Sequence, residues 1–163
     1  MSAPPSPGLE FAFEVVAEIG APLDLGLTPH GRRRIIPVNG GCFEGPALRG
    51  RVLPGGADWQ IVRADGSAEL DARYTLETDQ GALIYVSNRG MRHGPPEVLQ
   101  KLNAGETVDP RSYYFRTVAT FETGAAECEW LAKSIFVGEA ERYAAKVIIR
   151  FWRGWPPGSS PIH

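Results

Sequence analysis

Histidine and cysteine are scarce in this chain of 163 residues, which has three histidines and two cysteines. His30, His93 and His163 lie far apart and form no HxH or HExxH cluster, so the ligands of a metal-binding cupin barrel are missing. Cys42 and Cys128 show no CxxC spacing, and neither lies near a histidine in a recognisable catalytic pattern. We therefore expect two reduced thiols, no structural disulfide and no metal.

The chain also lacks a long apolar run and an excess of positive charge, and its first residues do not resemble a signal peptide. No window approaches the ~20 apolar residues of a membrane-spanning helix, and the first residues, MSAPPSPG, have neither a basic region nor an apolar run. Lys plus Arg (17) against Asp plus Glu (19) gives a formal charge of −2. The basic run GRRRI at 31 to 35 lacks interleaved aromatics and is typical of a solvated face. We expect a cytoplasmic protein with no nucleic-acid or membrane partner.

The sequence contains no standard nucleotide-binding or nucleophile motif. The glycine-bearing runs RGMRHG and VLPGGAD match neither a P-loop nor a dinucleotide fingerprint, and no strand–turn–helix unit follows them. No serine lies in a GxSxG elbow. We therefore expect no cofactor, which leaves acid/base chemistry as the candidate reaction type.

Glycine and proline are abundant, with 19 and 14 residues, which favours a turn-rich β protein over a helical one. The length fits one domain with a real core. Residues 1 to 8 and 156 to 163 are rich in proline, serine and glycine, and we expect both to be disordered. A single domain at residues 9 to 155 remains.

The dominant period within this domain is two. In LEFAFEVVAEI (9 to 19) apolar residues occupy one face and three glutamates the other, which predicts a strand covered on one side. ERYAAKVIIRFWR (141 to 153) repeats the pattern, and the other strand-like runs are ALRGRVL, DWQIVRA, ELDARYTLET, ALIYVSN, RSYYFRTVATFE and KSIFVG. One helix is predicted at residues 95 to 103. About eight or more strands joined by short turns favour a closed antiparallel, calycin-like β-barrel, with a β-sandwich as the alternative.

Two carboxylates, Glu44 and Asp58, lie on glycine-rich backbone in NGGCFEGPALRG and VLPGGAD, which predicts bends. If both segments end at one barrel mouth, they carry Glu44 and Asp58 toward a ligand, and the neighbouring Trp59 raises the pKa of Asp58 by desolvation. In the alternative interpretation both acids accept hydrogen bonds from neighbouring turn amides.

Charged residues also alternate with apolar ones in ELDARYTLET and SYYFRT. Asp71 and Arg73 share one face, and Tyr114 and Arg116 share another. Pattern alone favours solvated outer residues, because charged side chains are rarely buried unpaired. The alternative is a polar interior, in which acids, arginines and aromatics line a pocket.

Four long runs in the chain resemble the bacterial and fungal family called domain of unknown function 3237. They are GGCFEGPALRGRVLPGGADWQ, DARYTLETDQGALIYVSNRG, SYYFRT and IFVGEAER, in this order, within a resemblance from about Leu9 to Trp152. The resemblance implies a compact antiparallel β-barrel, often oligomeric, with a pocket at one mouth. It also implies an activity, because some fungal members are cofactor-free cyclases that close an oxygen ring on a phenolic or polyketide substrate. Its motif positions include Glu44, Asp58, Trp59, Asp71, Arg73, Tyr74, Asn88, Arg89, Tyr114 and Arg116.

Two functional hypotheses follow. The first is a cofactor-free cyclase, isomerase or lyase acting on a small oxygenated aromatic or polyketide-like compound. The second is a noncatalytic barrel that binds such a compound, and a barrel filled by its own side chains ranks third. The candidate acids are Glu44, Asp58 and Asp71, and the candidate ligand-binding residues are Trp59, Arg73, Tyr74, Tyr85, Asn88, Arg89, Tyr114, Arg116 and Trp130. Trp152 and Trp155, interpreted as exposed, predict a homodimer or higher homo-oligomer.

Overall fold

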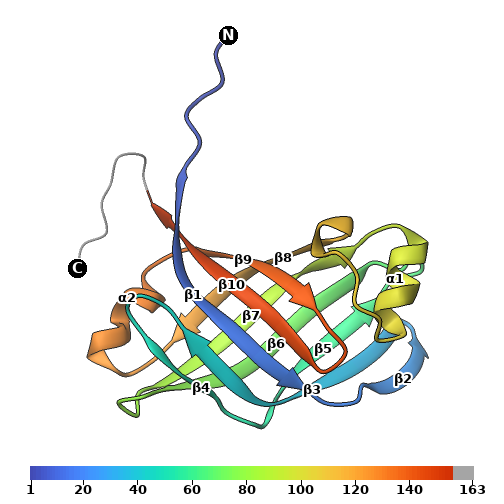
Figure 1. Ribbon diagram of the computed structural model, residues 1–163, viewed down its shortest axis with the longest axis horizontal. Helices are drawn as coiled ribbons and strands as arrows, with labels where there is room; N and C mark the ends of the chain where they lie inside the picture. Colours follow the sequence, from blue (N-terminus) through green and yellow to red (C-terminus); the bar gives the residue numbers. More distant parts are fainter. Residues whose placement is uncertain (156–163) are drawn as a thin grey trace.

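The computed structural model describes residues 1–155, and these residues form ten β-strands and a few short helices (Figure 1). The strands are β1 (Gly8–Ile19), β2 (Leu23–Thr28), β3 (Gly31–Glu44), β4 (Arg49–Val52), β5 (Gly56–Val62), β6 (Ala68–Thr78), β7 (Leu83–His93), β8 (Tyr114–Glu122), β9 (Phe136–Arg142) and β10 (Lys146–Trp155). The helices are α1 (Pro96–Asn103) and α2 (Glu129–Ala132), with 3-10 turns at Pro110–Ser112 and Ala126–Cys128.

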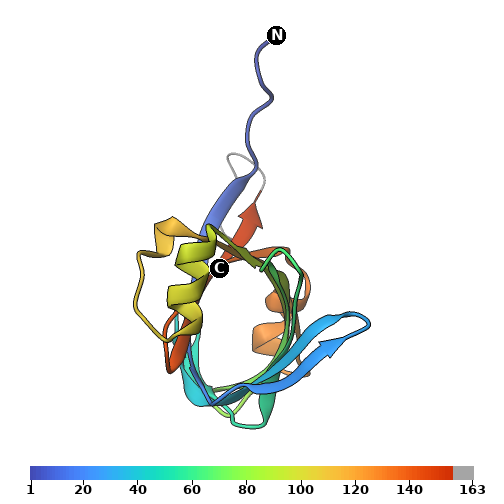
Figure 2. The ribbon, with the colours of Figure 1, turned by 90° about the vertical axis from the view of Figure 1, so that its right-hand side faces the viewer.

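The strands close into an antiparallel barrel. Neighbours follow the order β1, β10, β9, β8, β7, β6, and the barrel closes because β1 also pairs with β3. Between β6 and β3 lie β4 and β5, one after the other along the barrel, since each pairs with both flanking strands. Figure 2 shows the ring end-on, with the β2–β3 hairpin projecting from the wall. The predicted closed barrel is confirmed.

Sequence and structure agree on α1 and differ at α2. The predicted helix at residues 95 to 103 is α1, which begins after Pro95 with Pro96 in its first turn. The short helix α2 was not predicted. The segment 156 to 163, which we expected to be disordered, lies outside the described residues. In the segment 1 to 8, for which we expected the same, residues 1 to 7 carry no secondary structure and β1 begins at Gly8.

The glycine-rich stretch from residue 39 to Glu44, where the sequence predicts bends, forms the last part of the 14-residue strand β3. The backbone bends there at Gly40 and Gly41, whose φ angles are +154° and +127°. A side chain at Gly41 would meet the carbonyl oxygen of Val16 on the neighbouring strand β1. Glycine therefore lets β1 and β3 approach closely where the barrel closes.

The hydrophobic core fills the half of the barrel nearer α2. Five phenylalanine rings pack together there, with centroid distances of 4.9 to 6.0 Å: Phe13, Phe43, Phe121, Phe136 and Phe151. Leu131 of α2 is fully buried against the same core, and Trp130 lies 6.1 Å from Phe136. This end of the barrel is therefore closed by packed side chains, which leaves the α1 end for a site.

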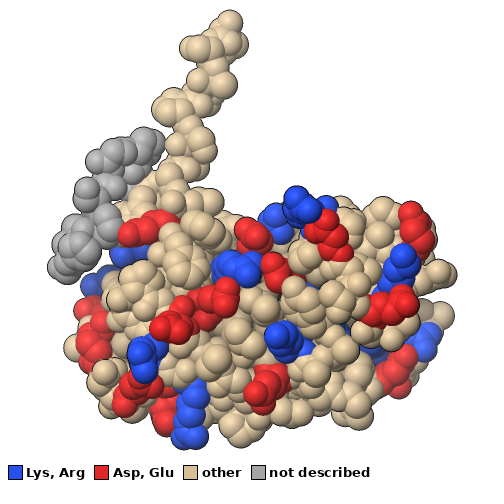
Figure 3. Space-filling view, viewed as in Figure 1, with Lys and Arg blue, Asp and Glu red and all other residues tan. Residues whose placement is uncertain are grey.

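The outer surface carries charges of both signs. In the face shown in Figure 3, acidic and basic side chains are interspersed, without a large region of one sign. Trp152 and Trp155 are half-buried rather than exposed as predicted, because Trp152 packs edge-on against Phe11 at 5.5 Å and Arg153 lies 4.0 Å over Trp155. The homo-oligomeric state stays a prediction, which now rests on the family resemblance and not on exposed tryptophans. No helix within residues 1–155 is long and apolar enough to span a membrane.

Candidate functional site

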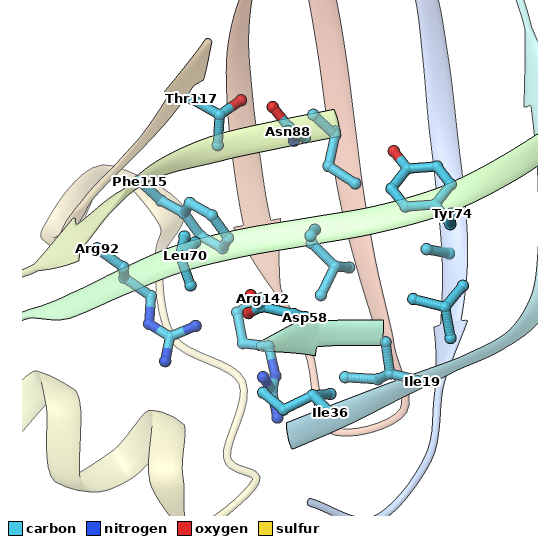
Figure 4. A pocket seen from close by; sticks show the side chains of 15 residues that line it. Ile19, Ile36, Asp58, Leu70, Tyr74, Asn88, Arg92, Phe115, Thr117 and Arg142 are labelled. Atoms are coloured by element: carbon cyan, nitrogen blue, oxygen red, sulfur yellow. The ribbon is translucent and has the colours of Figure 1, made fainter. Parts of the chain in front are cut away.

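A cavity lies inside the barrel in the half nearer α1 (Figure 4). About 60 Å³ of it is open to the centre of a water molecule. Since roughly 10–15 Å³ on this measure holds one water, the cavity has room for about four to six waters or one small organic molecule. Its walls are mainly apolar, and its polar lining residues are Asp58, Tyr74, Asn88, Arg92, Thr117 and Arg142.

Strand alternation directs these side chains inward. In β7 the buried positions are Ile84, Val86, Asn88 and Arg92, so two core residues near α2 are followed by two polar residues near the mouth. In β8 the buried residues Phe115 and Thr117 line the cavity, and β6 contributes Tyr74. The cavity therefore begins where the inward residues change from large and apolar to polar.

Three buried polar atoms in the cavity have no hydrogen-bond partner within the described part of the chain. They are the hydroxyl of Tyr74, Oδ1 of Asn88 and the hydroxyl oxygen of Thr117. Asn88 and Thr117 come from the adjacent strands β7 and β8 and lie close together in Figure 4. Burial raises the pKa of the Tyr74 hydroxyl well above its ordinary value, so this group is neutral and can donate a hydrogen bond. Buried groups left unpaired in this way cost stability.

Asp58 is the acid of the cavity, and its carboxylate is held in place. Its Oδ1 accepts a hydrogen bond of 2.9 Å from the backbone N–H of Asp71, and its Oδ2 accepts one of 3.3 Å from the amide of Gln60. Gln60 is fully buried and in turn accepts a hydrogen bond of 3.3 Å from Arg34. Burial raises the pKa of Asp58, against the opposing effects of the Asp71 amide and of the Arg92 and Arg142 charges.

Two arginines, Arg92 and Arg142, flank this carboxylate toward the mouth. Arg92 is only 5% exposed, and its guanidinium lies 5.5 Å over the ring of Phe115. Burial, together with the nearby charge of Arg142, lowers its pKa to about 10, so it is a cation at neutral pH. Arg142 donates to the carbonyl oxygen of Tyr143 at 2.9 Å, and its backbone N–H donates to the Tyr113 hydroxyl at 2.9 Å. In Figure 4 the Arg142 side chain lies beside Asp58.

Three of the residues proposed from sequence line the cavity: Asp58, Tyr74 and Asn88. Most of the others lie on the outer surface of the sheet. Asp71 forms salt bridges there with Arg73 at 3.4 Å and Arg89 at 3.7 Å, so the solvated-face interpretation describes these residues. Trp59 and Tyr85 are 39% and 40% exposed and border shallow outer grooves.

The remaining proposed residues also lie away from the cavity lining. Tyr114 is exposed and stacks on His93 at 4.8 Å, with Arg116 5.8 Å over its ring. Trp130 packs at the α2 end. Glu44 is exposed at the end of β3. Asp58 pairs with Ile36, which lies eight positions before Glu44 on the same strand, so the two acids do not border one mouth.

The ligand-binding residues proposed from sequence do not include Arg92, Thr117 and Arg142, although Arg92 is one of the arginines considered for a polar interior. A signal for the first two existed, because Arg92 shares its strand face with Ile84, Val86 and Asn88, and Thr117 shares its face with Phe115. Arg142 stands at the end of β9, where alternation does not decide the direction of a side chain. Within residues 1–155, no three histidine, cysteine or acidic side chains come together as a group that could hold a metal ion.

The fold and this cavity define a class: a closed antiparallel β-barrel with a small polar chamber at one end. Residues 7–154 match the family described as "Protein of unknown function (DUF3237)", and the chain belongs to this family. A UPF0311 protein of Rhodopseudomonas palustris strain TIE-1 is 48% identical over 88% of this chain and 95% of its own length. The UPF0311 protein CA_C3321 of Clostridium acetobutylicum is 42% identical over 88% and 92%.

Solved structures show the same architecture. The conserved protein RPA1785 of Rhodopseudomonas palustris has a TM-score of 0.89 at 45% identity, covering 93% of this chain and 99% of that one. A β-barrel-like protein of Acinetobacter baumannii has a TM-score of 0.80 at 44% identity, covering 94% and 99%. An enzyme of Penicillium herquei has a TM-score of 0.70 at 22% identity, covering 94% and 98%, which shows a common fold alone.

Proposed function

We propose that the protein binds a small oxygenated molecule inside the barrel. The observation that carries this proposal is the set of three unpartnered buried polar atoms, on Tyr74, Asn88 and Thr117, around one cavity. Protein interiors avoid such atoms because each costs about 1–3 kcal/mol. A ligand with hydroxyl or carbonyl oxygens satisfies them, while the apolar walls cover its carbon skeleton.

Within this site we assign Asp58 the role of proton donor and acceptor in a reaction without a cofactor, such as an isomerisation, a cyclisation or an elimination. Its position in the cavity wall and its raised pKa support this role, because a general acid or base works best when its pKa approaches the working pH. Glu44 and Asp71 have no part in the proposed reaction, since their side chains lie outside the cavity.

A noncatalytic binding barrel is the second candidate. The hydrogen bonds from the Asp71 amide and Gln60 favour it, because they oppose the effect of burial and stabilise the ionised form of Asp58, which can accept hydrogen bonds from a bound molecule. The two candidates share the cavity and differ in whether Asp58 exchanges a proton with the ligand. The cytoplasmic location and the homo-oligomeric state stay predictions.

The binding proposal is tested with phenol, which is neutral at pH 7 and combines an apolar ring with one hydroxyl group. Amide NMR spectra recorded during a titration should show saturable shifts concentrated in β6, β7 and β8, around the cavity. The variants Tyr74→Phe and Thr117→Val should weaken binding. The matched variants Tyr85→Phe and Thr120→Val alter exposed side chains on the outer surface of the barrel, and they should bind phenol as the wild type does. Shifts confined to outer residues, or none at millimolar concentrations of phenol, propionate and propionamide, would refute the proposal.

A further inference from the structure

At the mouth of the cavity Arg92 is buried and Arg34 and Arg142 are half-buried, and among the described residues all three lack the salt bridges that most arginines on the outer surface form. Ten salt bridges form within residues 1–155, and none of them includes Arg92, Arg142 or Arg34. On the outer surface, in contrast, Arg89 pairs with Asp71 although it is 72% exposed. A buried cation needs a partner more than an exposed one does, because burial removes its hydration. Salt bridges are therefore missing at the arginines that most need an anionic partner.

Asp58 does not supply the missing partner. Its single negative charge interacts with the charges of Arg92 and Arg142, and both of these guanidinium groups are also repelled by the charge of Arg34. Its two oxygens already accept hydrogen bonds from the Asp71 amide and from Gln60. The mouth of the cavity therefore holds more positive than negative charge, in a place where the low dielectric strengthens attraction to an anion.

We propose that the ligand of this cavity is a small organic anion whose charged oxygens bind between Arg92 and Arg142. The inference deepens the proposed function and rests on it. A carboxylate fits best, because a guanidinium binds it through paired hydrogen bonds. The other end of the ligand then faces Tyr74, Asn88 and Thr117, which suits a hydroxyl or carbonyl oxygen. Together with the size of the cavity, this describes a small hydroxy- or oxo-carboxylate.

This arrangement also gives Asp58 a defined task. An anion that neutralises Arg92 and Arg142 removes two charges that favour the ionised form of Asp58. The bound complex therefore has an Asp58 that takes up a proton more readily than in the free protein. A carboxylate ligand both occupies the site and prepares its acid for proton transfer.

The test compares propionate with propionamide, two molecules of five heavy atoms and nearly the same shape that differ in charge. In low-chloride buffer at pH 7, NMR titration of the wild type should give propionate an affinity at least tenfold higher. Arg92→Met and Arg142→Met should each abolish this preference. Arg89→Met, on the outer face of the same strand as Arg92, should keep it.

The outcomes separate the two proposals. Equal affinities, or tighter binding of propionamide, overturn the anion site. If phenol binds in the cavity and neither propionate nor propionamide does, the anion site falls and the proposed function stands. If none of the three molecules binds there, both fall. If Arg92→Met does not fold, the comparison on wild type and Arg142→Met still decides.

Discussion

The carboxylate of Asp58 inside the barrel is held by the backbone of Asp71, whose N–H donates to it at 2.9 Å while the Asp71 side chain points outward to Arg73 and Arg89. Neighbouring strands β5 and β6 thus present one acid to the cavity and the other to solvent. Only the inner acid combines burial, a fixed orientation and two nearby cations. The role of each aspartate follows from the face of its strand.

The stability of the protein should depend on the ionisation of Asp58. Burial raises its pKa in the folded state, so its contribution to stability is fully present below its ordinary pKa of 3.8 and is lost as the pH rises through the raised value. Asp58→Asn cannot ionise and escapes this loss. Urea unfolding at successive pH values above 3.5 should show the variant gaining stability relative to the wild type as the pH rises. If the stability of Asp58→Asn relative to the wild type stays constant or falls as the pH rises, the result would contradict the burial of this carboxylate.

Tyr74→Phe should stabilise the ligand-free protein. The hydroxyl of Tyr74 is buried without a partner, so its removal should raise the free energy of unfolding by about 1 kcal/mol. Tyr85→Phe, which alters a hydroxyl on the outer surface, should change it by less than 0.5 kcal/mol, about the limit for most surface substitutions. Chemical denaturation measures both. A loss of more than about 1 kcal/mol for Tyr74→Phe would mean that this hydroxyl already has a good partner in the free protein.

Gly41→Ala should damage the closure of the barrel. The new methyl group would meet the carbonyl oxygen of Val16, on backbone with a φ of +127°, so we expect a loss of about 3 kcal/mol or more in the free energy of unfolding. Gly55→Ala is the control, because Gly55 also has a positive φ (+107°) but has no atom near the added group. Its cost should be about 1 kcal/mol. Equal costs for the two variants would show that conformation, rather than the close approach of β1 and β3, is what requires glycine.

The sequence predicted the barrel because alternation is a local property that each strand displays in its own residues, as β1 does in residues 9 to 19. It predicted the site less well. Asp71, Arg73 and Arg89 have the residue types of a binding pocket, but their strand positions face solvent. The inward face of β7 could be read from the apolar neighbours of Asn88 and Arg92. The position along the strand where the packed core ends is, in contrast, a property of the closed barrel. Residue type alone therefore could not separate the outward-facing Arg73 from the inward-facing Arg92.

The most direct test of the binding site is a crystal structure of the protein soaked in millimolar phenol. The account predicts electron density for one phenol inside the barrel, with its hydroxyl oxygen within hydrogen-bond distance of Tyr74, Asn88 or Thr117. The matched Thr117→Val crystal should show weaker density at the same place. A wild-type structure in which the cavity contains only water, while phenol occupies the outer grooves near Trp59 and Tyr85, would contradict the central claim.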